Sequence, residues 1–134
     1  MKAVILVGGL GTRLRPLTCN TPKPMIPLVN QPFMEYILLN LRKQGITEVI
    51  LAVQYLADHF RSTLGDGSQL GINLHIAEEP EPRGTAGAVK NVEHLLDGTT
   101  FVFNGDVLTD LDLQAMLAFH REHNSKVTIS LTPV

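Results

Sequence analysis

Segments with a strand pattern alternate with segments of helical period along the whole chain, and this alternation limits the fold more than any other feature. Lys2–Val7 is a continuous apolar run of the kind that is covered on both faces of a parallel sheet. The segment 32–45 then repeats its apolar residues at helical spacing and ends on Gly45, a common stop signal. The same succession continues to the end of the chain. It predicts an α/β protein with a doubly wound, mostly parallel sheet.

The boundaries follow from the same patterns. We expect strands over 2–7, 48–53, 72–77, 100–106 and, alternating in polarity, 126–134. We expect helices over 32–45, 55–67, 84–96 and 113–123, with Pro32 at the first helical position and Asp112 as the amino-terminal cap of the last helix. In a common strand order of such sheets, the first and fourth strands are neighbours, so the loops after them would face one crevice.

Size and composition exclude several classes of protein. A chain of 134 residues, 44% hydrophobic and 18% charged, fits one folded domain rather than a disordered segment. No apolar run approaches the ~20 residues of a membrane span, and the first run is too short for a signal peptide. A net charge of −2 argues against a nucleic-acid partner. Cys19 is the single cysteine, so no internal disulfide can form, and we expect a cytoplasmic protein.

The segment from Gly8 to Gln31 has neither helical nor strand period. Loops longer than ~12–15 residues are uncommon in compact domains and usually serve a function or are disordered. Proline fixes the backbone dihedral φ and lowers the entropy that is lost on ordering. We therefore expect an ordered loop, because prolines recur along it and at the start of the next helix: Pro16, Pro22, Pro24, Pro27 and Pro32.

Three glycines, Gly8, Gly9 and Gly11, follow the first strand. Ligands of doubly wound sheets bind outside the carboxyl ends of the strands, and successive backbone amides in a glycine turn can bind an anion. The chain contains no P-loop motif, and the dinucleotide-binding pattern G-x-G-x-x-G places Leu14 at its third glycine. The glycines alone are therefore as compatible with a structural turn as with a phosphate site.

Cationic side chains strengthen the phosphate interpretation. Residues 1–34 contain Lys2, Arg13, Arg15 and Lys23 but no carboxylate, whereas the whole chain carries a net charge of −2. An uneven surface charge would explain this equally well. However, arginine offers forked donors to phosphate oxygens, and Lys23 stands between two prolines that restrict its backbone. Together with the glycine loop, these residues predict a cradle for a triphosphate.

Four motifs, in order, cover nearly the whole chain: GGLGTRLRPLT (8–18), TPKPMIPL (21–28), EPRGTAGAV (81–89) and NGDV (104–107). This set resembles the signature of the sugar-nucleotide pyrophosphorylases, which are nucleotidyltransferases with a Rossmann-like catalytic domain. The resemblance implies transfer of a nucleotidyl group from a nucleoside triphosphate to a sugar 1-phosphate, release of pyrophosphate and a requirement for Mg²⁺.

The resemblance also implies roles for individual residues. Arg13 matches the arginine that holds the triphosphate, Lys23 the lysine near the transferred phosphate, and Asp106 the Mg²⁺ ligand. Arg15 fits a solvated side chain better, and Asp110 and Asp112 fit a turn or a helix cap. The nucleotide-binding set that the resemblance implies is Leu6, Gly8, Gly9, Gly11, Thr12, Arg13, Glu79, Pro82 and Gly84.

Glu79 carries the expectation about the base. It stands five residues before Gly84, where thymidylyl and uridylyl relatives usually have glutamine and guanylyl relatives have glutamate. Guanine presents two adjacent donors, N1–H and N2–H₂, and an ionised carboxylate accepts both. We therefore expect GTP as the nucleotide. The alternative is an exposed acidic loop in which Glu78, Glu79 and Glu81 are solvated.

Within the family, GTAGA and NGDV look most like the mannose-1-phosphate guanylyltransferases. Family catalytic domains are considerably longer, and the sugar-gripping residues and a second Mg²⁺ aspartate would lie downstream. We therefore expect residues 1–134 to be the amino-terminal nucleotide-binding part, apparently truncated, with the sugar-binding part absent, and we expect self-association. Two alternatives remain: a glucose-1-phosphate thymidylyl- or uridylyltransferase, and a nucleotide-binding or regulatory module without catalysis.

Overall fold

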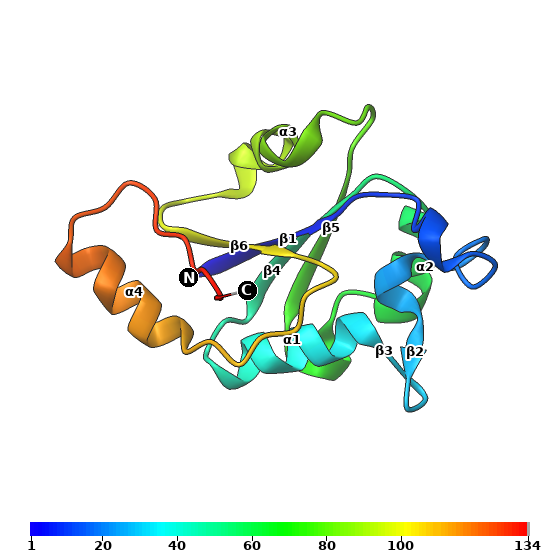
Figure 1. The fold of residues 1–134 in the computed structure, drawn as a ribbon, viewed down its shortest axis with the longest axis horizontal. Helices are drawn as coiled ribbons and strands as arrows, with labels where there is room; N and C mark the ends of the chain where they lie inside the picture. The colour runs from blue at the N-terminus through cyan, green and yellow to red at the C-terminus, as the bar shows by residue number, and fades with distance from the viewer. Residues whose placement is uncertain (134) are drawn as a thin grey trace.

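A four-stranded parallel sheet organises the fold in the computed structural model, which describes residues 1–133 (Figure 1). Its strands are β1 (Lys2–Val7), β4 (Glu48–Val53), β5 (Asn73–Glu78) and β6 (Thr100–Asn104). They lie in the order β5-β4-β1-β6, and every neighbouring pair is parallel. The first and fourth predicted strands are therefore neighbours, as expected, and the predicted doubly wound α/β fold is confirmed.

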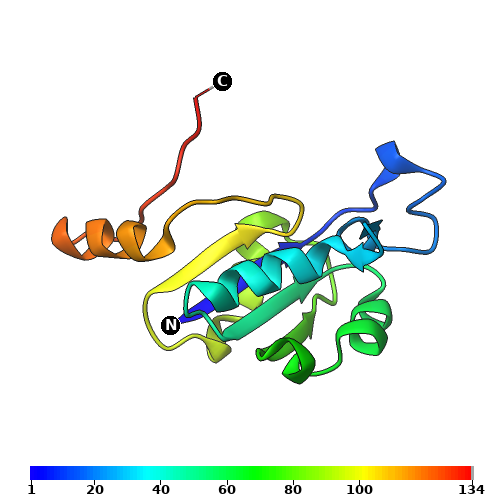
Figure 2. The same ribbon diagram turned by 90° about the horizontal axis from the view of Figure 1, so that it is seen from below.

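Helices cover both faces of this sheet. The helices that do so are α1 (Phe33–Lys43), α2 (Ala57–Leu64) and α3 (Gly84–Asn91), whereas α4 (Leu113–Glu122) extends beyond the sheet. Figure 1 shows α3 on one face and α1 on the other, and Figure 2 shows the same arrangement turned by 90°. In the described part of the chain, no helix is long and apolar enough to span a membrane.

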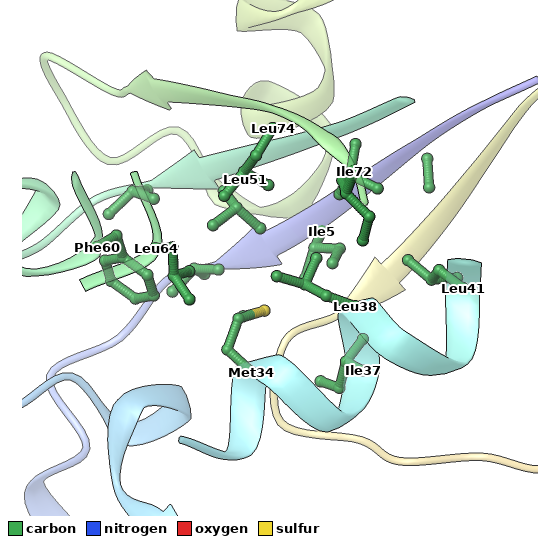
Figure 3. Close-up of a cluster of buried hydrophobic side chains, with 14 of the residues drawn as sticks. Ile5, Met34, Ile37, Leu38, Leu41, Leu51, Phe60, Leu64, Ile72 and Leu74 are labelled. Atoms are coloured by element: carbon green, nitrogen blue, oxygen red, sulfur yellow. The ribbon is translucent and has the colours of Figure 1, made fainter. Parts of the chain in front are cut away.

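The two faces bury unequal amounts of apolar surface. On the α1 face, Ile5 and Leu51 of the sheet pack with Met34 and Leu38 of α1 and with Phe60 of α2, all fully buried (Figure 3). Each such side chain contributes about 1.5–3 kcal/mol relative to remaining exposed. The α3 face has a smaller cluster, which consists of Val4, Ile50, Ala52, Ala88 and Val92. Alternate residues of the strands thus pack into the two clusters on opposite faces of the sheet, as a continuous apolar run predicts.

The segment after β1 is ordered as predicted, but it contains a hairpin that the sequence did not predict. Strands β2 (Pro27–Leu28) and β3 (Gln31–Pro32) pair in antiparallel fashion. The two linking residues, Val29 and Asn30, have φ of 50° and 64°, as a type I′ turn requires. Pro32 consequently belongs to β3, and α1 begins one residue later than expected.

The predicted final strand is wrong for residues 126–133, which form no strand; Val134 lies outside the described residues. The alternation is present, but Val127, Ile129 and Leu131 are 75%, 73% and 85% exposed. A strand needs a partner for its hydrogen bonds, and within residues 1–133 this segment pairs with none. Figure 2 shows the segment in red, running away from the sheet.

Several other predicted elements are shorter in the structure. Helix α1 ends at Lys43 rather than at 45, and α2 covers Ala57–Leu64 rather than 55–67. Strand β6 stops at Asn104, so Gly105 and Asp106 belong to the following loop rather than to the strand. The third helix ends at Asn91 and continues as a separate 3₁₀ turn over Glu93–Leu95.

Candidate active site

A cleft of about 560 Å³ lies along the carboxyl edge of the sheet. The first residues after the four strands all line it: Gly8, Gln54, Glu79 and Gly105. Hydrogen bonds of 3.2, 2.9 and 2.9 Å join the amides of Gln54, Glu79 and Gly105 to carbonyls of neighbouring strands. The ladder of the sheet therefore continues for one residue into the cleft wall and fixes the backbone there.

Most of the residues expected to bind the substrates line this one cleft. They are Leu6, Gly8, Gly9, Gly11, Thr12, Arg13, Lys23, Glu79, Gly84 and Asp106. Pro82 is exposed and does not line the cleft. The structure thus brings the expected catalytic, metal-binding and base-binding residues together, and their chemical roles remain predictions.

The glycine turn is held by Thr18, which is 2% exposed and whose Oγ1 donates to the Gly11 carbonyl at 2.7 Å. Gly11 has φ of +59°, and a Cβ there would lie 2.9 Å from Thr18 Cγ2. Both the backbone and the packing therefore require glycine. The Leu14 amide donates to the same carbonyl at 2.9 Å. This turn carries Arg13, which is exposed and has no ion pair within residues 1–133.

Lys23 and Asp106 meet across the cleft mouth, where Nζ lies 2.7 Å from Oδ2. Their side chains are 41% and 47% exposed, so both groups remain accessible to a ligand. Pro22 and Pro24 are both buried, which anchors the backbone on either side of the lysine. This agrees with the expectation that the reach of Lys23 is preset.

Asp106 fits a Mg²⁺ ion that is shared with a bound triphosphate. Within residues 1–133, no group of three His, Cys, Asp or Glu side chains could hold a metal by itself. Mg²⁺ commonly takes one or two carboxylates and completes its shell with water and substrate phosphates. A single half-exposed carboxylate beside the glycine turn is compatible with that requirement.

Glu79 is buried, contrary to the alternative of an exposed acidic loop. It is 7% exposed, and its Oε2 accepts a hydrogen bond of 3.0 Å from Gln54 Nε2. Its Oε1 is buried and has no hydrogen-bond partner among the described residues. Glu78 and Glu81 are exposed, as that alternative predicts. Oε2 of Glu78 forms an ion pair of 3.3 Å with Nη2 of Arg61.

The cations of the amino-terminal segment do not all serve the cleft. Lys2 lies at the opposite end of β1, where its Nζ donates to the Leu95 carbonyl at 2.7 Å and pairs with Asp97 at 2.9 Å. The hydrogen bond from Lys2 lowers the pKa of Asp97. Arg15 is exposed and does not line the cleft, which agrees with a solvated side chain. Arg13 and Lys23 are the cations that do line it.

Sequence reasoning gave no role to several lining residues, among them Gln54, Tyr55, Thr85 and Asn104. Gln54 belongs to no phosphate or metal motif. It is, however, the first residue after a strand of the parallel sheet, and the topological argument applied to Asp106 holds for it too.

Comparison with known proteins identifies the family, because the model of the nucleotidyl transferase family matches residues 2–134. The chain belongs to this family. It is 46% identical over 133 residues to mannose-1-phosphate guanylyltransferase from Mycobacterium tuberculosis, over 98% of this chain and 37% of that protein. It is 42% identical over 138 residues to mannose-1-phosphate guanyltransferase beta-B from Xenopus laevis, over 100% of this chain and 38% of that protein.

A solved structure has the same fold. HddC from Yersinia pseudotuberculosis, in its complex with GMP-PN, matches with a TM-score of 0.79 and 33% identity, over 89% of this chain and 53% of that one. The predicted family is therefore confirmed. The chain spans 37% and 38% of the length of the two curated relatives.

Proposed function

We propose that the cleft binds GTP and serves the transfer of GMP to a sugar 1-phosphate, with mannose 1-phosphate as the first candidate. The observation that carries the proposal is that Arg13, Lys23, Asp106 and Glu79 line one cleft at the carboxyl edge of the sheet. The named activities of the curated relatives support the choice of reaction, and the GMP-PN complex of HddC supports a guanine nucleotide.

The chemistry requires two polyanions to meet in line. An oxygen of the sugar phosphate forms a bond to the α-phosphorus while the bond to the bridging oxygen breaks, and pyrophosphate leaves with the electron pair. The exposed Arg13 offers forked donors to the departing pyrophosphate, and Lys23 offsets charge at the α-phosphate. Because the glycine turn is fixed by Thr18, its amides are oriented before the substrate arrives.

Asp106 would hold Mg²⁺, which supplies Lewis-acid neutralisation of the phosphate charge when it is bound. The present partner of Asp106 is Lys23, at 2.7 Å. Substrate binding would separate this pair, since the ammonium group then faces phosphate oxygens and the carboxylate is released for the metal. An ion pair of this exposure contributes only about 0–1 kcal/mol, so its separation costs little.

Glu79 supports guanine over the other bases. Its buried, unpartnered Oε1 needs a donor, and guanine brings two adjacent donors. Thymine and uracil bring one donor flanked by two acceptors, which would face the carboxylate with repulsive lone pairs. A glucose-1-phosphate thymidylyl- or uridylyltransferase is therefore the weaker alternative within the family.

Calorimetric titration of the purified chain with GTP, dTTP, UTP and ATP, each with and without Mg²⁺, tests the binding step. We expect selective binding of GTP that weakens when EDTA removes the metal. Preference for UTP or dTTP would instead support a thymidylyl- or uridylyltransferase. Absence of binding to all four nucleotides would refute it.

A second candidate is a nucleotide-binding module without catalysis, since the chain spans 37% of the length of the Mycobacterium tuberculosis relative. Pyrophosphate release from GTP, Mg²⁺ and mannose 1-phosphate separates the two candidates. Sustained turnover supports the transferase. Selective GTP binding without turnover supports the module.

A further inference from the structure

Gln54 forms a hydrogen bond with Glu79, the buried carboxylate that the proposed function assigns to the base. Its Nε2 donates to Glu79 Oε2 at 3.0 Å. The two residues are the first after the neighbouring strands β4 and β5, whose register pairs Val53 with Glu78. Their backbones are therefore fixed by the sheet ladder, and the hydrogen bond joins two side chains that start from rigid positions.

Gly8 leaves room for the other end of the glutamine amide. A Cβ at Gly8 would lie 2.9 Å from Gln54 Oε1, so the amide rests over the bare backbone of this glycine. Gly8 is the first residue after β1, which neighbours β4. The amide of Gln54 is thus held between β1 and β5, with its donor end toward Glu79.

The two carboxylate oxygens of Glu79 differ in their hydrogen bonding. Oε2 is occupied by Gln54, whereas Oε1 is buried without a partner among the described residues. A buried polar atom without a hydrogen bond destabilises the protein, and a ligand that donates to it removes that penalty. Each carboxylate oxygen has two acceptor sites, so Oε2 can also accept a second donor beside the one from Gln54.

We propose that Gln54 is a positioning residue for base selection: it orients Glu79 so that both carboxylate oxygens face the adjacent N1–H and N2–H₂ donors of guanine. This inference rests on the proposed function, because it needs the base to lie at Glu79. Adenine offers one donor beside an acceptor at the same edge, so the oriented carboxylate disfavours it.

The test compares the wild-type chain with Gln54→Leu, which keeps the size of the side chain and removes the donor. Binding is measured by calorimetry for GTP, for inosine triphosphate, which lacks the N2 amino group, and for tripolyphosphate, which lacks a base. We expect Gln54→Leu to lose about tenfold in GTP affinity, which corresponds to about 1.4 kcal/mol. The preference of the wild type for GTP over inosine triphosphate should fall toward one, with tripolyphosphate affinity unchanged.

Gln44→Leu is the matched control. Gln44 is also a partly buried glutamine, and it bonds the Leu111 carbonyl at 3.1 Å and the Leu113 amide at 2.8 Å, away from the cleft. Its loss should lower stability without altering the preference for GTP over inosine triphosphate. Gln54→Met repeats the test if the leucine variant does not fold, as judged by circular dichroism.

The outcomes separate the two proposals. If the wild type binds neither GTP nor tripolyphosphate, the proposed function fails and the role of Gln54 fails with it. If the wild type selects GTP and both Gln54 variants keep that selectivity, the inference about Gln54 is wrong while the proposed function stands. Equal weakening of GTP and tripolyphosphate would also overturn the inference, because it would indicate a general structural role.

Discussion

Three residue pairs contribute to the geometry of the cleft, and two of them join segments that are far apart in the chain. Thr18 holds Gly11, Lys23 pairs with Asp106, and Gln54 bonds Glu79. The pairs differ in exposure: Glu79 is 7% exposed, whereas the side chains of Lys23 and Asp106 are 41% and 47% exposed. The end of the cleft that we propose for the base is therefore buried, whereas the end that we propose for the phosphates is accessible to solvent.

Gly11→Ala tests the glycine turn. We expect the free energy of unfolding to fall by about 1–3 kcal/mol, because alanine adopts positive φ at a cost and its Cβ would meet the buried Thr18. We also expect weaker GTP binding. Gly45→Ala is the control, since Gly45 has φ of +84° and open space around it, away from the cleft. It should lower stability by about 1 kcal/mol and leave GTP binding unchanged. Urea titration and calorimetry measure the two effects.

Lys23→Ala tests the phosphate end. The ion pair with Asp106 is half-exposed, so its removal should change the free energy of unfolding by less than about 1 kcal/mol. Binding of Mg²⁺-GTP should lose about 1.5–3 kcal/mol, the usual contribution of a charge-assisted hydrogen bond. Arg15→Ala removes an equally charged, exposed residue outside the cleft and should leave binding nearly unchanged. Equal losses in both variants would contradict the role of Lys23.

At the scale of elements, α4 begins next to two aspartates with different contacts. Asp112 Oδ1 accepts a hydrogen bond of 2.9 Å from the Ala115 amide and caps the helix, as predicted. Asp112→Ala should lower the free energy of unfolding by about 1 kcal/mol. Asp110 is exposed, so Asp110→Ala should change it by less than about 0.5 kcal/mol. Urea unfolding followed by circular dichroism distinguishes the two, and equal values would mean that the cap contributes nothing.

The local pattern of apolar residues was sufficient to predict the strands that pair with other described strands. The apolar strands Lys2–Val7 and Glu48–Val53, for example, pair in parallel, as predicted. The hairpin was missed because Val29 and Asn30 occupy positions of positive φ where glycine is the usual signal. Residues 126–133 alternate as a strand does, but pairing depends on a neighbour that the pattern cannot supply.

The residues of the candidate site could likewise be predicted only in part. Arg13, Lys23 and Asp106 belong to motifs, so their convergence could be expected from the strand order. The burial of Glu79 and its contact with Gln54 depend on how two adjacent strand ends pack, which no motif encodes. Pro82 belongs to a motif but lies outside the cleft lining, because membership of a motif does not fix the direction of an exposed loop.

For the whole molecule, the side of the sheet beyond β6 is open and apolar. Strand β6 is an edge strand of the described sheet, and Val102 on it is 47% exposed. A groove of about 920 Å³ lies beside it, lined by β6, by α4 and by the segment 125–132. Edge strands with unpaired backbone groups and apolar neighbours are sites at which a second chain can pair.

We therefore predict that the chain self-associates through this edge. Light scattering over a concentration series should show a molecular mass that rises with concentration. Ile129→Lys should reduce the association, because Ile129 is 73% exposed and lines this groove, where a charge opposes burial. Val29→Lys is the control: Val29 is 93% exposed, but it lies in the β2–β3 hairpin at the other end of the molecule (Figure 1). A constant monomer mass at high concentration would contradict the prediction, and equal effects of the two lysines would point to general solubility rather than to this edge.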